Sequence, residues 1–203
     1  MKLKLTCLLT LVGLTGAALA APLTFDFKDP KRVNNAAFKL AAPLEVLLGN
    51  ANGISGTVTF DPDKPATTKG KIVVATASLQ VPNPMQKQHM LGGQWLDAAQ
   101  FPEITFEAKA LKNVTTTSNL TSADVLGTFT LKGVAKEMTV PVKLTYLKDK
   151  LAERVPGQTG DLLVLRASFN IQRRDFNIMP GQREDKVSDT IELTLGVVGA
   201  APR

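Results

Sequence analysis

Apolar and polar residues alternate along most of the chain, which is typical of half-buried β-strands. A clear example is residues 54–60, where Ser and Thr make one face and the other face is made by Ile54, Gly56, Val58 and Phe60. Clusters of Gly, Pro, Asn and Asp separate such segments and predict turns between them. The same alternation predicts strands over residues 23–27, 34–40, 69–79, 103–111, 124–131, 137–147, 161–171 and 190–198.

The pattern does not settle every strand. In residues 69–79, either the face with Val73 or the face with Val74 can point inward. Residues 44–48 are apolar without a clear period, and the sequence GNANG at residues 49–53 predicts a turn. The Thr-, Ser- and Asn-rich residues 113–124 fit a hairpin loop or the tips of two strands.

Two further strand features follow from the alternation. In the strand that begins at Glu103, we expect one face to carry Ile104, Phe106, Ala108 and Ala110. The sequence KGVAK at residues 132–136 predicts a tight connection in which Gly133 adopts a positive φ.

A different pattern occupies the middle of the chain. Pro84 suits the first turn of a helix because its missing N–H would have no partner there, and good helix formers follow it. Gly92-Gly93 predicts the end of this helix, and Pro102 directs the chain back into a strand at Glu103. The segment is too apolar for a solvated loop, so we expect it to cover another apolar surface.

Many alternating strands separated by turns indicate an all-β fold, either a sandwich or a closed barrel. Small residues recur on the apolar faces, namely Ala75, Ala77, Ala108, Ala110 and Gly127. A closed barrel of about eight strands is just wide enough to be packed solid or to enclose one ligand. The small residues favour the hollow barrel.

The first twenty residues have the features of a signal peptide. Lys2 and Lys4 precede an apolar run, and Ala18-Leu19-Ala20 fits a cleavage site. A retained N-terminal anchor is the alternative. Because Cys7 lies within this segment, residues 21–203 contain no cysteine, and we expect them to form one domain in the periplasm or outside the cell.

Composition argues against several classes of function. The chain has 24 Lys+Arg against 18 Asp+Glu, and only 5% aromatic residues, so it lacks the stacking surfaces typical of single-stranded nucleic-acid binding. It contains one His and no motif of a nucleophilic hydrolase, a phosphate-binding loop or a calcium loop. We therefore predict neither an enzyme nor a metal site.

Two groups of polar residues have two interpretations each. His89 could bind a haem iron with Met85 or Met90 as its partner, or belong to a packed helical face. Arg173, Arg174 and Asp175 could form a surface ion pair, or direct a guanidinium towards a ligand head group.

Several motifs together resemble the YceI-like family of secreted, lipocalin-like barrels. The matching segments are residues 56–62, His89-Met90-Leu91, Trp95-Leu96-Asp97, residues 101–106, residues 127–134, Val140-Pro141-Val142 and residues 171–178. The resemblance implies an eight-stranded antiparallel β-barrel with a short helical insertion around residues 84–99. It also implies an elongated apolar tunnel for a polyisoprenoid, such as an isoprenoid quinone or a similar amphiphile.

From this resemblance and the strand pattern we predict a lipid-binding protein that sequesters or transports such a ligand without a further cofactor. The predicted tunnel lining is Val58, Phe60, Val74, Met90, Leu91, Trp95, Phe101, Ile104, Phe106, Phe129, Val140 and Phe169. The predicted head-group residues are His89, Arg173 and Asp175. Transient membrane contact and a monomer or homodimer are also expected. The alternatives are a redox helper that handles haem or quinone, and a solid-cored stress or interaction protein.

Overall fold

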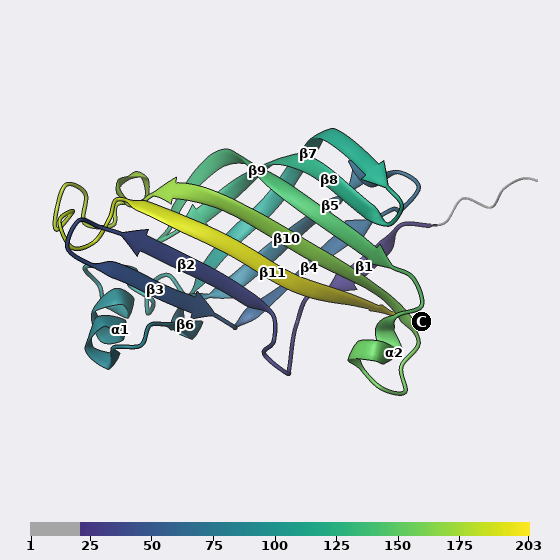
Figure 1. Cartoon of the computed structure of the whole chain (residues 1–203), viewed down its shortest axis with the longest axis horizontal. Coiled ribbons are helices and arrows are strands. Elements are labelled where there is room, and N and C mark those ends of the chain that lie inside the picture. Colours follow the sequence, from purple (N-terminus) through teal and green to yellow (C-terminus); the bar gives the residue numbers. More distant parts are fainter. Residues whose placement is uncertain (1–20) are drawn as a thin grey trace, which may run out of the picture.

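Eight antiparallel strands form a closed barrel in the computed structural model, which describes residues 21–203 (Figure 1). The predicted signal peptide and Cys7 lie outside the described residues. Around the barrel the strands follow the order β1 (Leu23–Asp26), β4 (Ile54–Phe60), β5 (Lys69–Ala75), β7 (Glu103–Thr117), β8 (Leu120–Leu131), β9 (Val134–Leu147), β10 (Gly160–Gln172) and β11 (Thr190–Pro202). The circle closes where Asp26 of β1 lies opposite Ala200 of β11.

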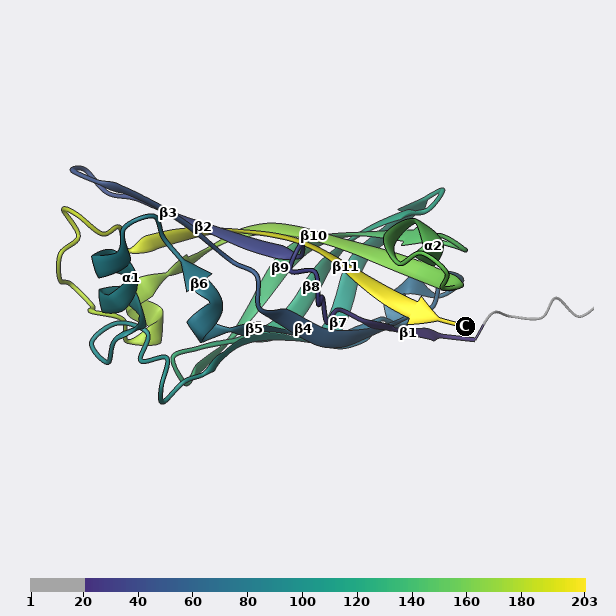
Figure 2. The ribbon, with the colours of Figure 1, turned by 90° about the horizontal axis from the view of Figure 1, so that it is seen from below.

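Three further strands extend the barrel wall at one end. β2 (Asn35–Ala41) pairs with β11, β3 (Val46–Ala51) pairs with β2, and the short β6 (Leu79–Gln80) pairs with β3. Helix α1 (Pro84–Leu91) lies at this end, whereas α2 (Leu151–Arg154) lies at the end with the C-terminus (Figures 1 and 2). Short 3₁₀ turns occupy Pro65–Thr67, Thr76–Ser78 and Arg173–Phe176.

The predicted helix is confirmed and its start has a clear cause. The Asn83 side chain accepts hydrogen bonds from the backbone N–H groups of Met85 and Gln86, at 2.9 and 3.3 Å. Pro84 occupies the first turn, where no N–H is needed. The helix ends at Leu91, directly before Gly92-Gly93.

Most predicted strand faces are confirmed. Ile54, Val58 and Phe60 are buried on β4, and Val125 and Phe129 are buried on β8. The sequence left the inward face of β5 open. In the structure, the face with Ile72 and Val74 points inward, and Ile72 is buried. Residues 113–124 form the tips of β7 and β8 rather than a long loop, and Gly133 has a φ of 74° as predicted.

Three predictions about local structure are wrong. Residues 49–51 belong to β3 rather than to a turn, because Gly49 lies opposite Phe38 and leaves room for its ring. The strand predicted over residues 69–79 ends at Ala75, where the Thr76 N–H donates to the Pro102 carbonyl instead. A register shift between Ala108 and Ala110 places Leu111, not Ala110, on the inner wall.

The buried side chains form two clusters at opposite ends of the barrel. One, towards the end with the C-terminus, includes Phe25, Phe27 and Phe60. The other, at the α1 end, includes Phe38, Phe129 and Phe176. Within residues 21–203, no helix is long and apolar enough to cross a lipid bilayer.

Candidate functional site

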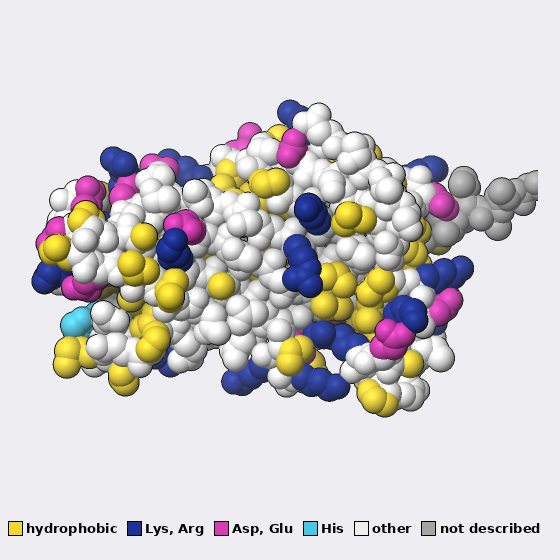
Figure 3. Space-filling model, in the orientation of Figure 1, with side chains coloured by type: hydrophobic (Ala, Val, Ile, Leu, Met, Phe, Trp, Pro, Cys, Tyr) yellow, Lys and Arg dark blue, Asp and Glu magenta, His cyan; other side chains and the backbone are white. Residues whose placement is uncertain are grey.

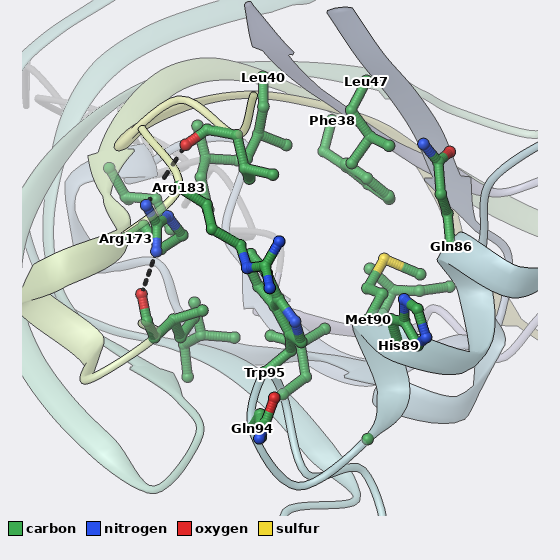
Figure 4. Close-up of a pocket in the computed structure, with 18 of the residues that line it drawn as sticks. Phe38, Leu40, Leu47, Gln86, His89, Met90, Gln94, Trp95, Arg173 and Arg183 are labelled. Atoms are coloured by element: carbon green, nitrogen blue, oxygen red, sulfur yellow. Dashed lines mark hydrogen bonds between the residues drawn. The ribbon is translucent and has the colours of Figure 1, made fainter. Parts of the chain in front are cut away.

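The α1 end of the barrel contains an apolar cavity of about 740 Å³, which we call the mouth chamber. Its walls come from β2, β3, α1, residues 92–96 and the loop of residues 178–188, here named the mouth loop (Figure 4). Phe38, Leu40, Met90 and Trp95 are among the side chains that line it. Its size lies within the range of ordinary small-ligand pockets.

A second, smaller cavity of about 150 Å³ lies deeper in the barrel, and we call it the inner chamber. Small residues from several strands contribute to its wall, including Ala36, Gly70, Ala108 and Ala167. The two chambers are adjacent, because Phe38, Leu79, Ile104, Phe129 and Leu193 line both of them. We call the two chambers together the bore.

Polar side chains are concentrated at the mouth. They are Glu45, Gln86, Gln88, His89, Gln94, Arg183 and Lys186. Figure 4 shows the Arg183 side chain extending across the chamber towards Trp95 and Gln94. The bore therefore has a polar outer end and an apolar inner end, which suits an amphiphile that enters tail first.

The hydrophobic surface continues outside the mouth. Leu44, Val46, Leu48 and Met85 are 57–69% exposed, on or near β3 and α1. Figure 3 shows hydrophobic side chains gathered over β2, β3 and α1, close to the single histidine. The turn between β2 and β3 is tied to the mouth loop by the Leu44 N–H, which donates to the Asp185 carbonyl at 3.0 Å.

The Arg173 side chain holds the mouth loop through hydrogen bonds. Its five N–H groups donate to backbone carbonyls of the loop, namely those of Ile178, Met179, Gln182, Val187 and Ser188. The guanidinium also lies 5.5 Å from the Trp95 ring centroid, within cation–π range. Burial lowers the pKa of Arg173, and the charges of Asp189 and Glu184 oppose that shift. Because all five donors are occupied, Arg173 has no free donor for a ligand head group.

Most of the predicted lining residues lie along the bore. Met90, Trp95, Ile104 and Phe129 line the mouth chamber, as do the head-group candidates His89 and Arg173. The inner chamber is lined by Val58, Val74, Ile104, Phe106, Phe129, Val140 and Phe169. The structure thus brings predicted residues from six strands and from α1 to the two chambers.

Four predicted site residues lie elsewhere. Phe60 packs against Tyr146 in the cluster towards the C-terminus, with ring centroids 6.0 Å apart. Leu91 packs against the cluster at the α1 end without lining either chamber, and the Phe101 ring lies over Gly133. Asp175 is exposed and does not line the mouth.

Several lining residues were missing from the prediction. Phe38 and Leu40 follow the alternation of β2, so their inward face was available from the sequence. Arg183, Lys186 and Val187 come from the mouth loop, which has no periodic pattern, and only its contacts with Arg173 place them. Among residues 21–203, no group of three or more His, Cys, Asp or Glu side chains converges as a metal site would require.

Comparisons with known proteins cover nearly all of this architecture. Residues 21–198 match the YceI-like domain family. A UPF0312 protein of Yersinia pestis is 30% identical over 202 residues, covering 94% of this chain and 96% of the relative. Relatives with similar identity occur in Yersinia pseudotuberculosis and Yersinia enterocolitica.

Solved structures share the same fold. The crystal structure of Burkholderia cenocepacia BcnA matches with a TM-score of 0.62 and 25% identity, over 81% of this chain and 94% of BcnA. A polyisoprenoid binding domain from Saccharophagus degradans matches with a TM-score of 0.63 and 11% identity, over 90% of this chain and 100% of that domain. The family match, the barrel and the α1 insertion agree, and this chain belongs to the YceI-like family.

Proposed function

We propose that this protein binds a long-chain lipid of the polyisoprenoid class and carries or sequesters it without chemical conversion. The observation that carries the proposal is the pair of adjacent apolar chambers, in which all charged and amide side chains line the outer chamber and the inner chamber has only three threonines as polar lining residues. The polyisoprenoid binding described for the Saccharophagus degradans domain, which has the same fold, supports the choice of ligand class. No cofactor other than the bound lipid is needed for this function.

The hydrophobic effect supplies the driving force. Removing a tail from water yields about 25 cal/mol per Å² of apolar surface, so a long tail contributes several kcal/mol after the cost of ordering it. Few polar contacts are then required. This explains how a pocket with a sparse polar rim can hold an amphiphile, and the cavity disfavours the solid-cored alternative.

We place the head group at the mouth, near His89, Arg183 and Lys186. These three side chains border the chamber, and Arg183 reaches across it (Figure 4). Arg173 acts indirectly, because its donors are committed to the mouth loop. His89 is exposed at the end of α1, and Met85 is 66% exposed. This arrangement gives no support to haem ligation by this pair.

We place the protein in the periplasm or outside the cell, in line with the signal-peptide pattern. The monomeric or homodimeric state and the transient membrane contact stay predictions.

The test is organic extraction of protein purified from its native host, followed by mass spectrometry. We expect a stoichiometric lipid with an isoprenoid tail. Phe106→Asp places a charge in the inner chamber and is expected to abolish lipid uptake. Thr139→Asp adds the same charge on the exposed face of β9 and serves as the matched control. Absence of lipid, with no uptake of offered polyprenols by the wild type, would contradict the proposal.

A further inference from the structure

The inner chamber depends on two glycines that each make room for an aromatic ring. A Cβ added at Gly127 would lie 2.5 Å from Cζ of Phe106, and one added at Gly49 would lie 2.1 Å from Cζ of Phe38. Both distances are far shorter than carbon atoms tolerate. The added Cβ would also lie 2.6 Å from the Glu107 carbonyl oxygen at Gly127 and 2.5 Å from the Gln80 carbonyl oxygen at Gly49. The rings and these backbone atoms together occupy the space that any other side chain would need. The two glycines therefore allow the Phe106 and Phe38 rings to pack against the wall of the bore.

These two rings lie where the mouth chamber meets the inner chamber, and along the inner chamber itself. Phe38 lines both chambers, and Phe106 lines the inner chamber. A side chain at either glycine would push the adjacent ring away from the wall. Because interiors are close-packed, the ring would move towards the nearest empty space, which is the lumen.

Aromatic rings lie beside the inner end of the bore. The inner-chamber residues Val58 and Leu144 belong to the same buried cluster as Phe25 and Phe60, whose rings pack against Tyr146 with centroids 6.3 and 6.0 Å apart. Phe25 is fully buried. A tail that enters from the mouth therefore meets a fixed end wall.

The same kind of ring and glycine pair occurs away from the bore. A Cβ at Gly199 would lie 2.7 Å from the Phe27 ring, which is fully buried in the same cluster as Phe25. Neither residue lines a chamber. This pair provides a control for the contact between ring and glycine, because the Cβ at Gly199 would meet the Phe27 ring alone and the pair lies away from the ligand path.

We propose that the inner chamber selects ligands by tail length, and that Gly127 and Gly49 set this selection. A tail long enough to pass Phe38 and Phe129 gains the apolar contacts of the inner chamber, whereas a shorter tail occupies the mouth chamber alone. A tail that exceeds the end wall gains nothing more inside. The inference rests on the proposed lipid-binding function and adds a specificity determinant to it.

The experiment is a titration of the wild type with all-trans prenols of three, four and nine isoprene units, followed by the fluorescence of Trp95. Trp95 is the only tryptophan and lines the mouth chamber, so short and long tails both report there. We expect affinity to rise with length and then to level off. Gly127→Ala is expected to weaken binding of the long prenols at least tenfold and to change binding of the shortest less than twofold.

Two further variants keep the test decisive. Phe106→Leu combined with Gly127→Ala removes the clash with the ring and leaves the contact with the Glu107 carbonyl oxygen, so it is expected to restore part of the preference for long prenols. Gly199→Ala is expected to lower stability yet keep the wild-type length profile. If wild-type affinity does not depend on length, or if Gly127→Ala and Gly199→Ala have the same profile, the length filter is overturned while lipid binding stands. If the wild type binds no prenol, the proposed function itself fails.

Discussion

The two ends of this barrel use similar residues for opposite purposes. At the closed end, Phe25, Phe27 and Phe60 are at most 2% exposed and line neither chamber. At the open end, Phe38 and Phe129 are also buried, yet both border empty space. The difference comes from the neighbours. Phe25 and Phe60 pack against the Tyr146 ring, whereas Phe38 and Phe129 line a chamber whose wall also contains small residues such as Ala51 and Ala108.

Polar groups differ between the two ends in the same way. At the closed end, the buried Asp161 carboxylate accepts hydrogen bonds from the Tyr146 hydroxyl and the Asp149 N–H, each at 2.8 Å, and from Arg203. At the open end, Arg183 crosses the mouth towards Trp95 (Figure 4). The hydrogen-bond network around Asp161 stabilises the closed end. The polar side chains around the mouth are placed to contact a ligand. We therefore expect stability and binding to separate along the barrel axis.

The largest expected effect is at the closed end. Phe25→Ala should lower the free energy of unfolding by about 3–5 kcal/mol, because it leaves a cavity in a buried core. Phe38→Ala at the open end should cost less, because part of that ring already borders a cavity. Urea unfolding of both variants measures the contrast. Equal losses would break the proposed division of the barrel.

The strands show how much of this division is present in the sequence. Alternation is local, so it correctly placed β4, β8, β9 and β11, and the Pro84 signal correctly placed α1. It failed where a distant partner decides the outcome. Gly49 is a strand residue only because Phe38 lies opposite, and no local pattern reveals the register shift after Ala108.

The site was predictable to a similar degree. Inward strand positions such as Val58, Val74 and Phe106 follow from alternation, and the structure places them on the bore. The role of Arg173 does not follow, because its partners are backbone carbonyls of a loop with no periodic pattern. Sequence reasoning indicated the charge of Arg173 but not that its donors would all be occupied.

A smaller effect is expected from Arg173→Met, which keeps an unbranched apolar side chain and removes the five donors. Loss of these bonds leaves buried carbonyls without partners and should cost about 1–3 kcal/mol. The mouth loop should become the first site of limited proteolysis, and lipid affinity should fall. Lys109→Met is the control, because the Lys109 and Glu137 side chains are 51% and 57% exposed and their ion pair should contribute about 1 kcal/mol or less. Unchanged proteolysis would show that Arg173 does not hold the loop.

The smallest effect is a pH dependence at the closed end. Burial favours the neutral form of Asp161, but the Asp149 N–H, the Tyr146 hydroxyl and Arg203 together hold its pKa below the ordinary value. Burial, followed by the hydrogen bond to Asp161, raises the pKa of Tyr146 to about 12, so this hydroxyl stays protonated at neutral pH. A lowered carboxyl pKa stabilises the fold above the unfolded-state value and loses that effect as the pH falls through the folded-state value.

Asp161→Asn should therefore destabilise the protein at pH 7 by about 1–2 kcal/mol, and the gap to the wild type should narrow below about pH 4. Urea unfolding at pH 7 and pH 3 measures both values. Asp149→Asn is the control, since the Asp149 side chain is 68% exposed and shares Arg203 with Asp161. Lipid affinity at pH 7 should be the same in all three proteins, because Asp161 and Asp149 lie outside the bore. A loss of affinity in Asp161→Asn without unfolding would show that the two ends are coupled.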